Sequence, residues 1–277
     1  MKTVYYYQTF IGLEKLLTHV EDIDTIIISS IHFDKDKQKN KQIYLNDNLP
    51  DNPKFNTMWM ETKEIYDQGK LILLMVGGAG GAYSELFSDF ETYYPLLRDL
   101  LREKTYIGGI DLDIEEGVSL DNVKMLIRKL NDDFGKDFIL TMAPIAGSMI
   151  TDDSGMGGFS YKELSLSEEG KRINWYHVQC YQSFSKDTYD QIIKNKWKPE
   201  QIVMGMMSGQ FTKDTFKNAL QEGQSCLKAY PEMCGVFVWE YIDSPPDMND
   251  PSQWCRMMKN PQEYLDSVDS LIEENQE

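Results

Sequence analysis

Three acidic side chains recur at every second position of the segment 110–115, which reads Ile-Asp-Leu-Asp-Ile-Glu. A period of two predicts a β-strand that carries Asp111, Asp113 and Glu115 on one face and aliphatic residues on the other. The three carboxyl groups would step along the strand at intervals of about 6.6 Å. Because the aliphatic face needs an apolar partner such as a layer of helices, the acidic face is expected to point into an enclosed space.

Enclosure would decide the chemistry of this acid ladder, the name used below for Asp111, Asp113 and Glu115. Three like charges in a partly buried site cannot all stay ionised without a large free-energy penalty, so at least one carboxyl group should hold a proton near neutral pH. A protonated carboxyl group at the open end of a strand is what a general acid requires. The segment alone leaves two other interpretations open, a solvated acidic face on an edge strand and a site for a divalent metal ion.

Segments typical of strands alternate with segments typical of helices along the whole chain. Strands are expected near residues 4–8, 24–33, 70–78, 106–115, 138–144, 173–184, 202–208 and 234–241. Helices are expected near residues 13–20, 57–68, 83–103, 119–133, 187–195, 211–228 and 252–272, with Ser119 as an N-cap. Polar residues 34–54 predict a long loop or a small hairpin, and residues 145–170 a Gly/Ser-rich excursion.

Eight strand–helix units predict parallel pairing and a closed (β/α)8 TIM barrel, in a single domain over residues 1–277. A doubly wound open sheet is the alternative, but the glycines at 77–81 match neither the dinucleotide nor the nucleotide-triphosphate pattern. In a barrel of this kind the chemistry lies at the C-terminal ends of the strands. Glu115 is therefore expected at the mouth, with Asp113 one step deeper and Asp111 deeper still.

Charge and hydropathy limit the partners. Lys and Arg number 28 against 45 Asp and Glu, a net charge of −17, which disfavours nucleic acid and anionic membranes and favours a neutral substrate. No run approaches the ~18 apolar residues of a membrane span. Met1-Lys2 leads directly into a strand-like segment without a signal peptide, so an intracellular protein is expected. We also expect the protein to act as a monomer. Export by another route, or removal of a leader, would also fit.

The four cysteines, Cys180, Cys226, Cys234 and Cys255, show no close spacing typical of a metal site. We expect free, buried thiols, with a disulfide as the alternative.

These elements together resemble glycoside hydrolase family 18, which carries Asp-Gly-x-Asp-x-Asp-x-Glu on the fourth strand of a (β/α)8 barrel. Residues 109–115 match that motif from its glycine onward. The glycine-rich segment at 77–83, Ile-Glu-x-Gly at 114–117, Gln-x-Tyr at 179–181 and Trp239 are most similar to the compact class III, plant-type chitinases.

Three positions depart from the family pattern. Gly108 stands for the first Asp, Met75 for the usual Ser before Gly-Gly, and Gln182 for a common Asn or Asp; the cysteine pattern of the secreted enzymes is also absent. No sizeable insertion follows the seventh strand, which predicts an open groove and cleavage within chains or of short oligomers.

The resemblance implies a retaining mechanism in which the substrate's own N-acetyl group attacks the anomeric carbon, without metal or cofactor. Glu115 would protonate the leaving oxygen and then activate water. Asp113 would hydrogen-bond the acetamido N–H, and Asp111 would share a proton with it. Tyr181 would hold the acetamido oxygen, although an amphipathic core tyrosine is the alternative.

Other residues have weaker assignments. Trp239 is expected to form the apolar floor under the sugar, or else to be a core residue, while Gln179 and Tyr6 are further candidates for substrate contact. Gly77 and Gly78 would let the backbone approach the ligand, or would serve only a turn. His32 and His177 are expected to be structural.

The leading functional hypothesis is hydrolysis of β-1,4-linked N-acetylglucosamine in chitin or chito-oligosaccharides. An endo-β-N-acetylglucosaminidase acting on N-glycan cores uses the same chemistry. A non-catalytic sugar-binding protein is the alternative from another class, but such proteins usually lose an acid of the ladder, and all three remain here. A metal-dependent hydrolase using Asp111 and Asp113 is a third possibility.

Overall fold

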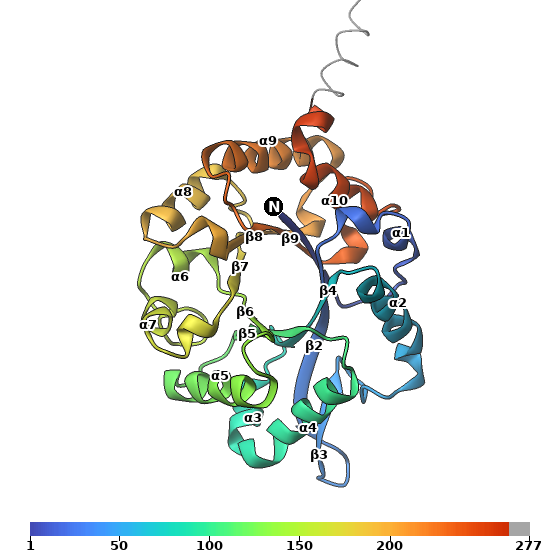
Figure 1. The fold of residues 1–277 in the computed structure, drawn as a ribbon, viewed down its shortest axis with the longest axis vertical. Coiled ribbons are helices and arrows are strands. Elements are labelled where there is room, and N and C mark those ends of the chain that lie inside the picture. Colours follow the sequence, from blue (N-terminus) through green and yellow to red (C-terminus); the bar gives the residue numbers. More distant parts are fainter. Residues whose placement is uncertain (266–277) are drawn as a thin grey trace, which may run out of the picture.

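Eight parallel strands close into a barrel in the computed structural model, which describes residues 1–265. The ring closes because the first strand pairs with both the second and the last, as Figure 1 shows looking into the barrel. The expected (β/α)8 barrel is therefore confirmed. Its strands are β1 (Lys2–Tyr7), β2 (Thr25–Lys35), β4 (Leu71–Gly77), β5 (Gly109–Asp113), β6 (Ile139–Met142), β7 (Trp175–Gln179), β8 (Ile202–Met207) and β9 (Gly235–Trp239).

Helices surround the barrel on its outer side (Figure 1). They are α1 (Glu14–Leu17), α2 (Asn56–Asp67), α3 (Tyr83–Ser88), α4 (Phe90–Glu103), α5 (Leu120–Phe134), α6 (Ala146–Ile150), α7 (Tyr161–Leu166), α8 (Lys186–Lys194), α9 (Lys213–Ala229) and α10 (Ser252–Lys259). The Ser119 hydroxyl accepts a hydrogen bond from the Asn122 N–H, so its expected role as the N-cap of α5 is confirmed. No helix of residues 1–265 is long and apolar enough to cross a membrane.

Alternate residues of each strand belong to two different cores. In β1, Val4 and Tyr6 point into the barrel, whereas Tyr5 and Tyr7 pack in the layer between the strands and the helices. In β5 the same alternation sends the aliphatic residues outward to the helices, which leaves the acidic residues facing the barrel interior.

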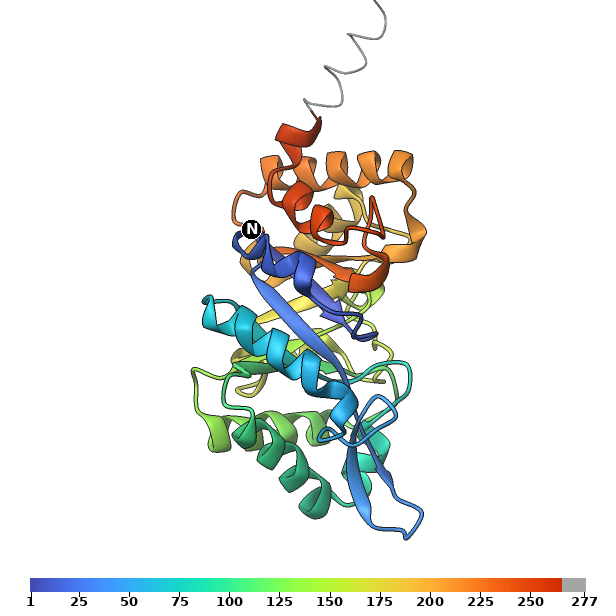
Figure 2. The ribbon, with the colours of Figure 1, turned by 90° about the vertical axis from the view of Figure 1, so that its right-hand side faces the viewer.

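The segment 34–54, expected to be a loop or a hairpin, contains a hairpin. β2 continues past its barrel partners, and β3 (Lys41–Leu45) pairs antiparallel with this extension from Ile31 to Lys35. Figure 2 shows the two strands projecting beyond the barrel. The hairpin therefore forms a wall at the mouth of the barrel.

Several expected boundaries differ from the structure. The helix expected at 83–103 is two helices, because Asp89 adopts an extended backbone with φ −156° between α3 and α4. The excursion at 145–170 contains α6 and α7. β5 ends at Asp113, two residues before Glu115. The last expected helix begins as α10, and its part beyond residue 265 lies outside the described residues.

All four cysteines are free in the structure, as expected. Cys180, Cys226 and Cys255 are buried, and Cys234 is half-buried.

Candidate active site

The acid ladder lies inside the barrel, at the end where the strands finish. Asp111 and Asp113 are only 0% and 5% exposed, so the acidic face of β5 is enclosed and not a solvated edge. Glu115 follows the end of the strand and is half-buried. The ladder therefore runs from the closed interior of the barrel toward its mouth.

Asp111, the deepest member, is held by three hydrogen-bond donors from three other strands. The Tyr6 hydroxyl donates to its Oδ2 over 2.8 Å, and the Thr141 hydroxyl donates to its Oδ1. His177 Nδ1 lies 2.9 Å from the same Oδ1. The Asp111 carboxyl group is shielded from solvent and accepts hydrogen bonds from three donors. This arrangement suits the ionised carboxylate form.

The tautomer of His177 follows from its second contact. The Trp175 indole N–H, which can only donate, lies 3.0 Å from His177 Nε2. His177 Nε2 is therefore the acceptor, and His177 Nδ1 carries the hydrogen and donates a hydrogen bond to Asp111. The sequence predicted a structural His177, and the ring is fully buried; its contact with Asp111, 66 residues away, was not predicted.

Asp113 is in a different environment. Burial raises the pKa of its carboxyl group well above the ordinary value, and the neighbouring Glu115 and Asp111 raise this pKa further. One described hydrogen bond reaches it, from Gln179 Nε2 to Oδ1 over 3.2 Å. Of the three acids, Asp113 is thus the one whose surroundings most disfavour the charged form.

Gln179, at the end of β7, connects the two outer acids. Its Nε2 atom lies 3.2 Å from Asp113 Oδ1, 3.2 Å from Glu115 Oε1 and 3.0 Å from the Ala143 carbonyl oxygen. The two amide hydrogens are thus shared among three acceptors. Contact of Gln179 with substrate stays a prediction; in the structure its amide lies between Asp113 and Glu115.

Aromatic side chains complete the mouth. Trp239, at the end of β9, is half-buried, with its ring 5.3 Å from the Tyr6 ring. Tyr181 is half-buried beside Phe237, and burial, followed by Asp113 and Glu115, raises the pKa of its hydroxyl well above the ordinary value. Tyr181 is therefore a neutral hydrogen-bond donor. Tyr6 faces the interior as expected, but its hydroxyl is bound to Asp111.

The glycine turn after β4 packs directly against the ladder. Gly77 and Gly78 have φ angles of 98° and 87°, and a Cβ atom on Gly77 would lie 2.2 Å from the Asp113 carbonyl oxygen. The Gly78 N–H donates to the same carbonyl oxygen over 2.9 Å. Both positions thus require glycine for the turn itself.

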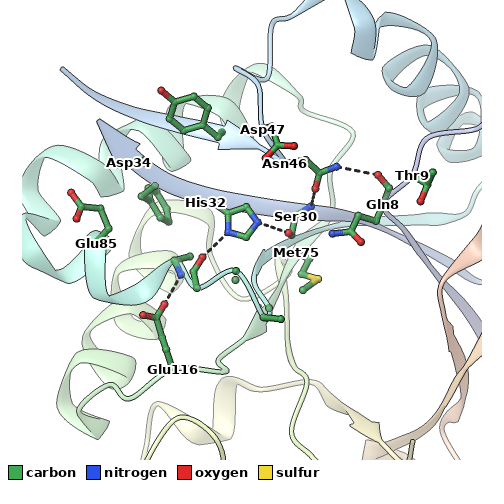
Figure 3. Close-up of a pocket in the computed structure, with 18 of the residues that line it drawn as sticks. Gln8, Thr9, Ser30, His32, Asp34, Asn46, Asp47, Met75, Glu85 and Glu116 are labelled. Carbon is green, nitrogen blue, oxygen red and sulfur yellow. Dashed lines mark hydrogen bonds between the residues drawn. The ribbon is translucent and has the colours of Figure 1, made fainter. Parts of the chain in front are cut away.

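A cavity of about 1280 Å³ lies at the mouth of the barrel, and Figure 3 shows residues that line it. Met75, Gly77, Gly78 and Trp239 line the end nearest the ladder, and the opposite wall comes from the β2–β3 hairpin. Asp113 Oδ2 lies 3.6 Å from the position of a Cβ atom on Gly78, so the ladder borders this cavity. A volume above the ~300–1,000 Å³ typical of small-ligand sites suits an extended ligand.

Polar groups cross-link the walls of the cavity. His32 Nδ1 lies 2.6 Å from the Gly81 carbonyl oxygen, and its Nε2 lies 2.8 Å from the Ser30 hydroxyl. Asn46 Oδ1 accepts from the Ser30 N–H, and Figure 3 shows these contacts in one row. His32 thus ties β2 to the glycine turn, as a structural residue would, and it also lines the cavity, which the sequence did not reveal.

The structure shows the surroundings of two departures from the family motif. A Cβ atom on Gly108 would lie 2.8 Å from Leu71 Cδ1, so an aspartate here would require that side chain to move. Met75, in place of the usual Ser, is buried in the barrel core and lines the cavity.

Potential metal ligands cluster at one place in the described part of the chain, and this place is not the acid ladder. Among residues 1–265, the one set of three potential ligands with atoms within 4.8 Å of one another is His19, Glu21 and Asp22. This set lies around the turn Val20–Asp22, away from the ladder. In the ladder, both oxygens of Asp111 are already occupied by protein donors.

Comparison with solved structures finds close relatives of the whole barrel. A fungal endo-β-N-acetylglucosaminidase of glycosyl hydrolase family 18 is 29% identical, with a TM-score of 0.81 over 95% of this chain and 99% of that one. Chitinase ChiC from Aspergillus fumigatus is 29% identical, with a TM-score of 0.79 over 93% and 98%. A family 18 chitinase from Pseudoalteromonas aurantia, 17% identical with a TM-score of 0.68 over 93% and 99%, supports the fold alone. No protein-family model and no curated protein sequence matches the chain.

A closed (β/α)8 barrel with a carboxyl ladder on its fourth strand, aromatic side chains at its mouth and an adjoining cavity has the architecture of a glycosidase. The solved structures that match the chain support a family 18 glycoside hydrolase, as its motifs indicated. Its placement among the plant-type enzymes stays a prediction.

Proposed function

We propose that this protein hydrolyses β-1,4-linked N-acetylglucosamine in chitin or chito-oligosaccharides, with retention of configuration at the anomeric carbon. The observation that carries the proposal is the unequal environment of the ladder. A multiply bonded Asp111 and a desolvated Asp113, whose pKa is raised by burial, lie behind a half-buried Glu115 at the barrel mouth. This arrangement separates the acids into different roles, as substrate-assisted hydrolysis requires.

The reaction would proceed in two steps. In the first, the acetamido oxygen of the substrate bonds to C1 while the C1–O glycosidic bond breaks, and Glu115 gives its proton to the leaving oxygen. In the second, water attacks C1, Glu115 recovers a proton from that water, and the bond between C1 and the acetamido oxygen breaks. Tyr181, neutral and able to donate, would hydrogen-bond the acetamido oxygen before the attack.

Asp113 would accept a hydrogen bond from the acetamido N–H of the substrate. A protonated carboxyl group keeps one carbonyl oxygen as an acceptor, which suits this N–H. Asp111 accepts three hydrogen bonds, so one of its roughly four lone-pair positions remains for the Asp113 hydroxyl. Rotation of Asp113 from Gln179 toward the substrate would then pair both of its oxygens.

Product analysis tests this proposal. Chitotetraose incubated with the wild-type enzyme should give shorter oligomers whose new reducing ends are initially the β-anomer by proton NMR. Release of the α-anomer would contradict retention, and the absence of any cleavage would favour a sugar-binding protein without turnover.

A second substrate in the same chemistry is the chitobiose core of an N-linked glycan. The observation that favours it is the solved endo-β-N-acetylglucosaminidase, which matches this chain as well as the chitinase does. The long cavity beside the ladder could hold the rest of such a glycan. Parallel assays on chitotetraose and on a glycopeptide with a high-mannose chain distinguish the two substrates by which of them is cut.

The partner is thus a neutral glycan containing N-acetylglucosamine. The net charge of −17 fits this and disfavours nucleic acid and anionic membranes. We further propose that the enzyme acts as a monomer.

A further inference from the structure

Glu116 directly follows the proposed general acid, yet its side chain turns to the neighbouring loop. Its Oε1 accepts from the backbone N–H groups of Ala82 and Tyr83, over 2.5 Å for Tyr83, and its Oε2 accepts from the Ser84 hydroxyl. These donors form the start of α3, which follows the glycine turn (Figure 3). Glu116 thus joins the ends of β4 and β5.

The carboxylate form of Glu116 is favoured in this contact. Burial acts to raise its pKa, but hydrogen bonds from Ser84, Ala82 and Tyr83 outweigh burial and lower the pKa below the ordinary value. Charge-assisted hydrogen bonds of this kind are among the stronger ones in proteins. The link is therefore strong at every pH at which the enzyme would be assayed near neutrality.

The position of Glu115 depends on this link. β5 pairs with β4 only as far as Asp113, so Glu115 lies beyond the last ladder pair. Its carboxyl group has one described hydrogen bond, at 3.2 Å from Gln179. On the far side, the next backbone tie is the Val118 N–H to the Gly157 carbonyl oxygen. Glu116 is the anchor between these two points.

We propose that Glu116 is a positioning residue, which holds Glu115 where it can protonate the leaving oxygen. This proposal rests on the hydrolase function proposed above. A misplacement of about 1 Å can cost on the order of 10²-fold in rate, so loss of the anchor should act mainly on the step that needs the acid.

A pair of substrates separates this role from a general loss of structure. Chitotetraose has a poor leaving group that needs a proton, whereas 4-nitrophenyl chitobioside releases an aryl oxide that does not. For Glu116→Ala, kcat/KM on chitotetraose should fall on the order of 10²-fold, while kcat/KM on the aryl glycoside should fall less than about 10-fold. Glu116→Gln keeps one acceptor oxygen for the two N–H groups, so it should recover part of the loss.

Asp24 provides a matched control at the opposite end of the barrel. Its Oδ2 accepts from the Thr3 N–H over 2.9 Å and from Lys259 Nζ over 2.5 Å, so it also joins neighbouring segments. Asp24→Ala should lower thermal stability and leave both kcat/KM values unchanged. Wild-type enzyme that cuts neither substrate would refute the proposed function and not this role.

With active wild-type enzyme, equal losses on the two substrates would overturn the positioning role, and so would full activity of Glu116→Ala. If Glu116→Ala does not fold, the same comparison of kcat/KM losses on chitotetraose and on the aryl glycoside is made with Glu116→Gln. A larger loss on chitotetraose supports the proposal, and losses of equal size contradict it.

Discussion

Gln179 donates to Glu115, with its amide nitrogen 3.2 Å from Glu115 Oε1, and so ties the end of β7 to the proposed acid at the end of β5. The same nitrogen reaches Asp113. One neutral amide therefore bridges the two outer acids of the ladder.

Replacing Gln179 by Met keeps the length of the side chain and removes both amide hydrogens. In this variant kcat on chitotetraose should fall on the order of 10²-fold, because Asp113 and Glu115 lose their shared donor. Gln191→Met is the control, since Gln191 is exposed on α8 and bonds to Asp187. Unchanged kcat in Gln179→Met would show that the amide does not position the acids.

The deep end of the ladder should be sensitive to loss of a single hydroxyl. Tyr6→Phe removes a donor to the Asp111 carboxylate, and a hydrogen bond to a charged group contributes about 1.5–3 kcal/mol to the free energy of unfolding. Tyr5→Phe removes hydrogen bonds to two neutral backbone groups, the Pro251 carbonyl oxygen and the Cys255 N–H, for which about 0.5–1.5 kcal/mol each is expected. Urea unfolding measures both.

Activity should separate these two variants as well. Tyr5 packs outside the barrel, so Tyr5→Phe should keep the wild-type kcat, whereas Tyr6→Phe should lower it. Equal kcat values in the two variants would contradict the assignment of Asp111 as a carboxylate held by Tyr6.

Asp113 should make stability depend on pH. Its pKa is raised in the folded protein, so between an ordinary value of about 3.9 and that raised pKa the folded state binds more protons than the unfolded state. The free energy of unfolding contributed by this group is therefore fully present below about pH 4 and is lost as pH rises through the folded pKa. Asp113→Asn, which is permanently neutral, should remove this decline.

Urea unfolding of wild type and Asp113→Asn from pH 5 to 8 tests the sign. The stability difference should shift in favour of Asp113→Asn as pH rises, although the variant should hydrolyse chitotetraose poorly. A difference that is constant with pH would place the proton elsewhere.

Glu61 on α2 offers a stability gain away from the site. It is 4% exposed and its Oε2 has no hydrogen-bond partner, and burial, with Glu14 and Glu64 nearby, raises its pKa. An unsatisfied buried polar group costs about 1–3 kcal/mol, so Glu61→Met should raise the free energy of unfolding at pH 7. Thermal unfolding measures the gain, and a lower melting temperature would mean that Glu61 has a favourable role.

The sequence predicted the barrel well because each strand shows either an alternation of apolar and polar residues or a continuous run of apolar residues. The Asp111-Leu112-Asp113 alternation placed acids inside and aliphatic residues outside, and both placements are confirmed. The break at Asp89 was missed, because it depends on one extended residue inside an otherwise continuous helical pattern.

The supporting contacts of the site could not be predicted. His177 meets Asp111 and Glu116 meets Tyr83 only because strands distant in sequence share a barrel end, and the side-chain period does not give that register. The adjacent acids at 115 and 116 were visible in sequence, but their opposite directions were not.

The central claim is that Glu115 supplies the proton for glycosidic cleavage. Glu115→Gln keeps the size of the side chain and cannot donate an acidic proton, so kcat on chitotetraose should fall at least about 10²-fold, the usual minimum contribution of a general acid. Binding of chitotetraose, measured by calorimetry on the same variant, should persist. Wild-type turnover in Glu115→Gln would contradict the account.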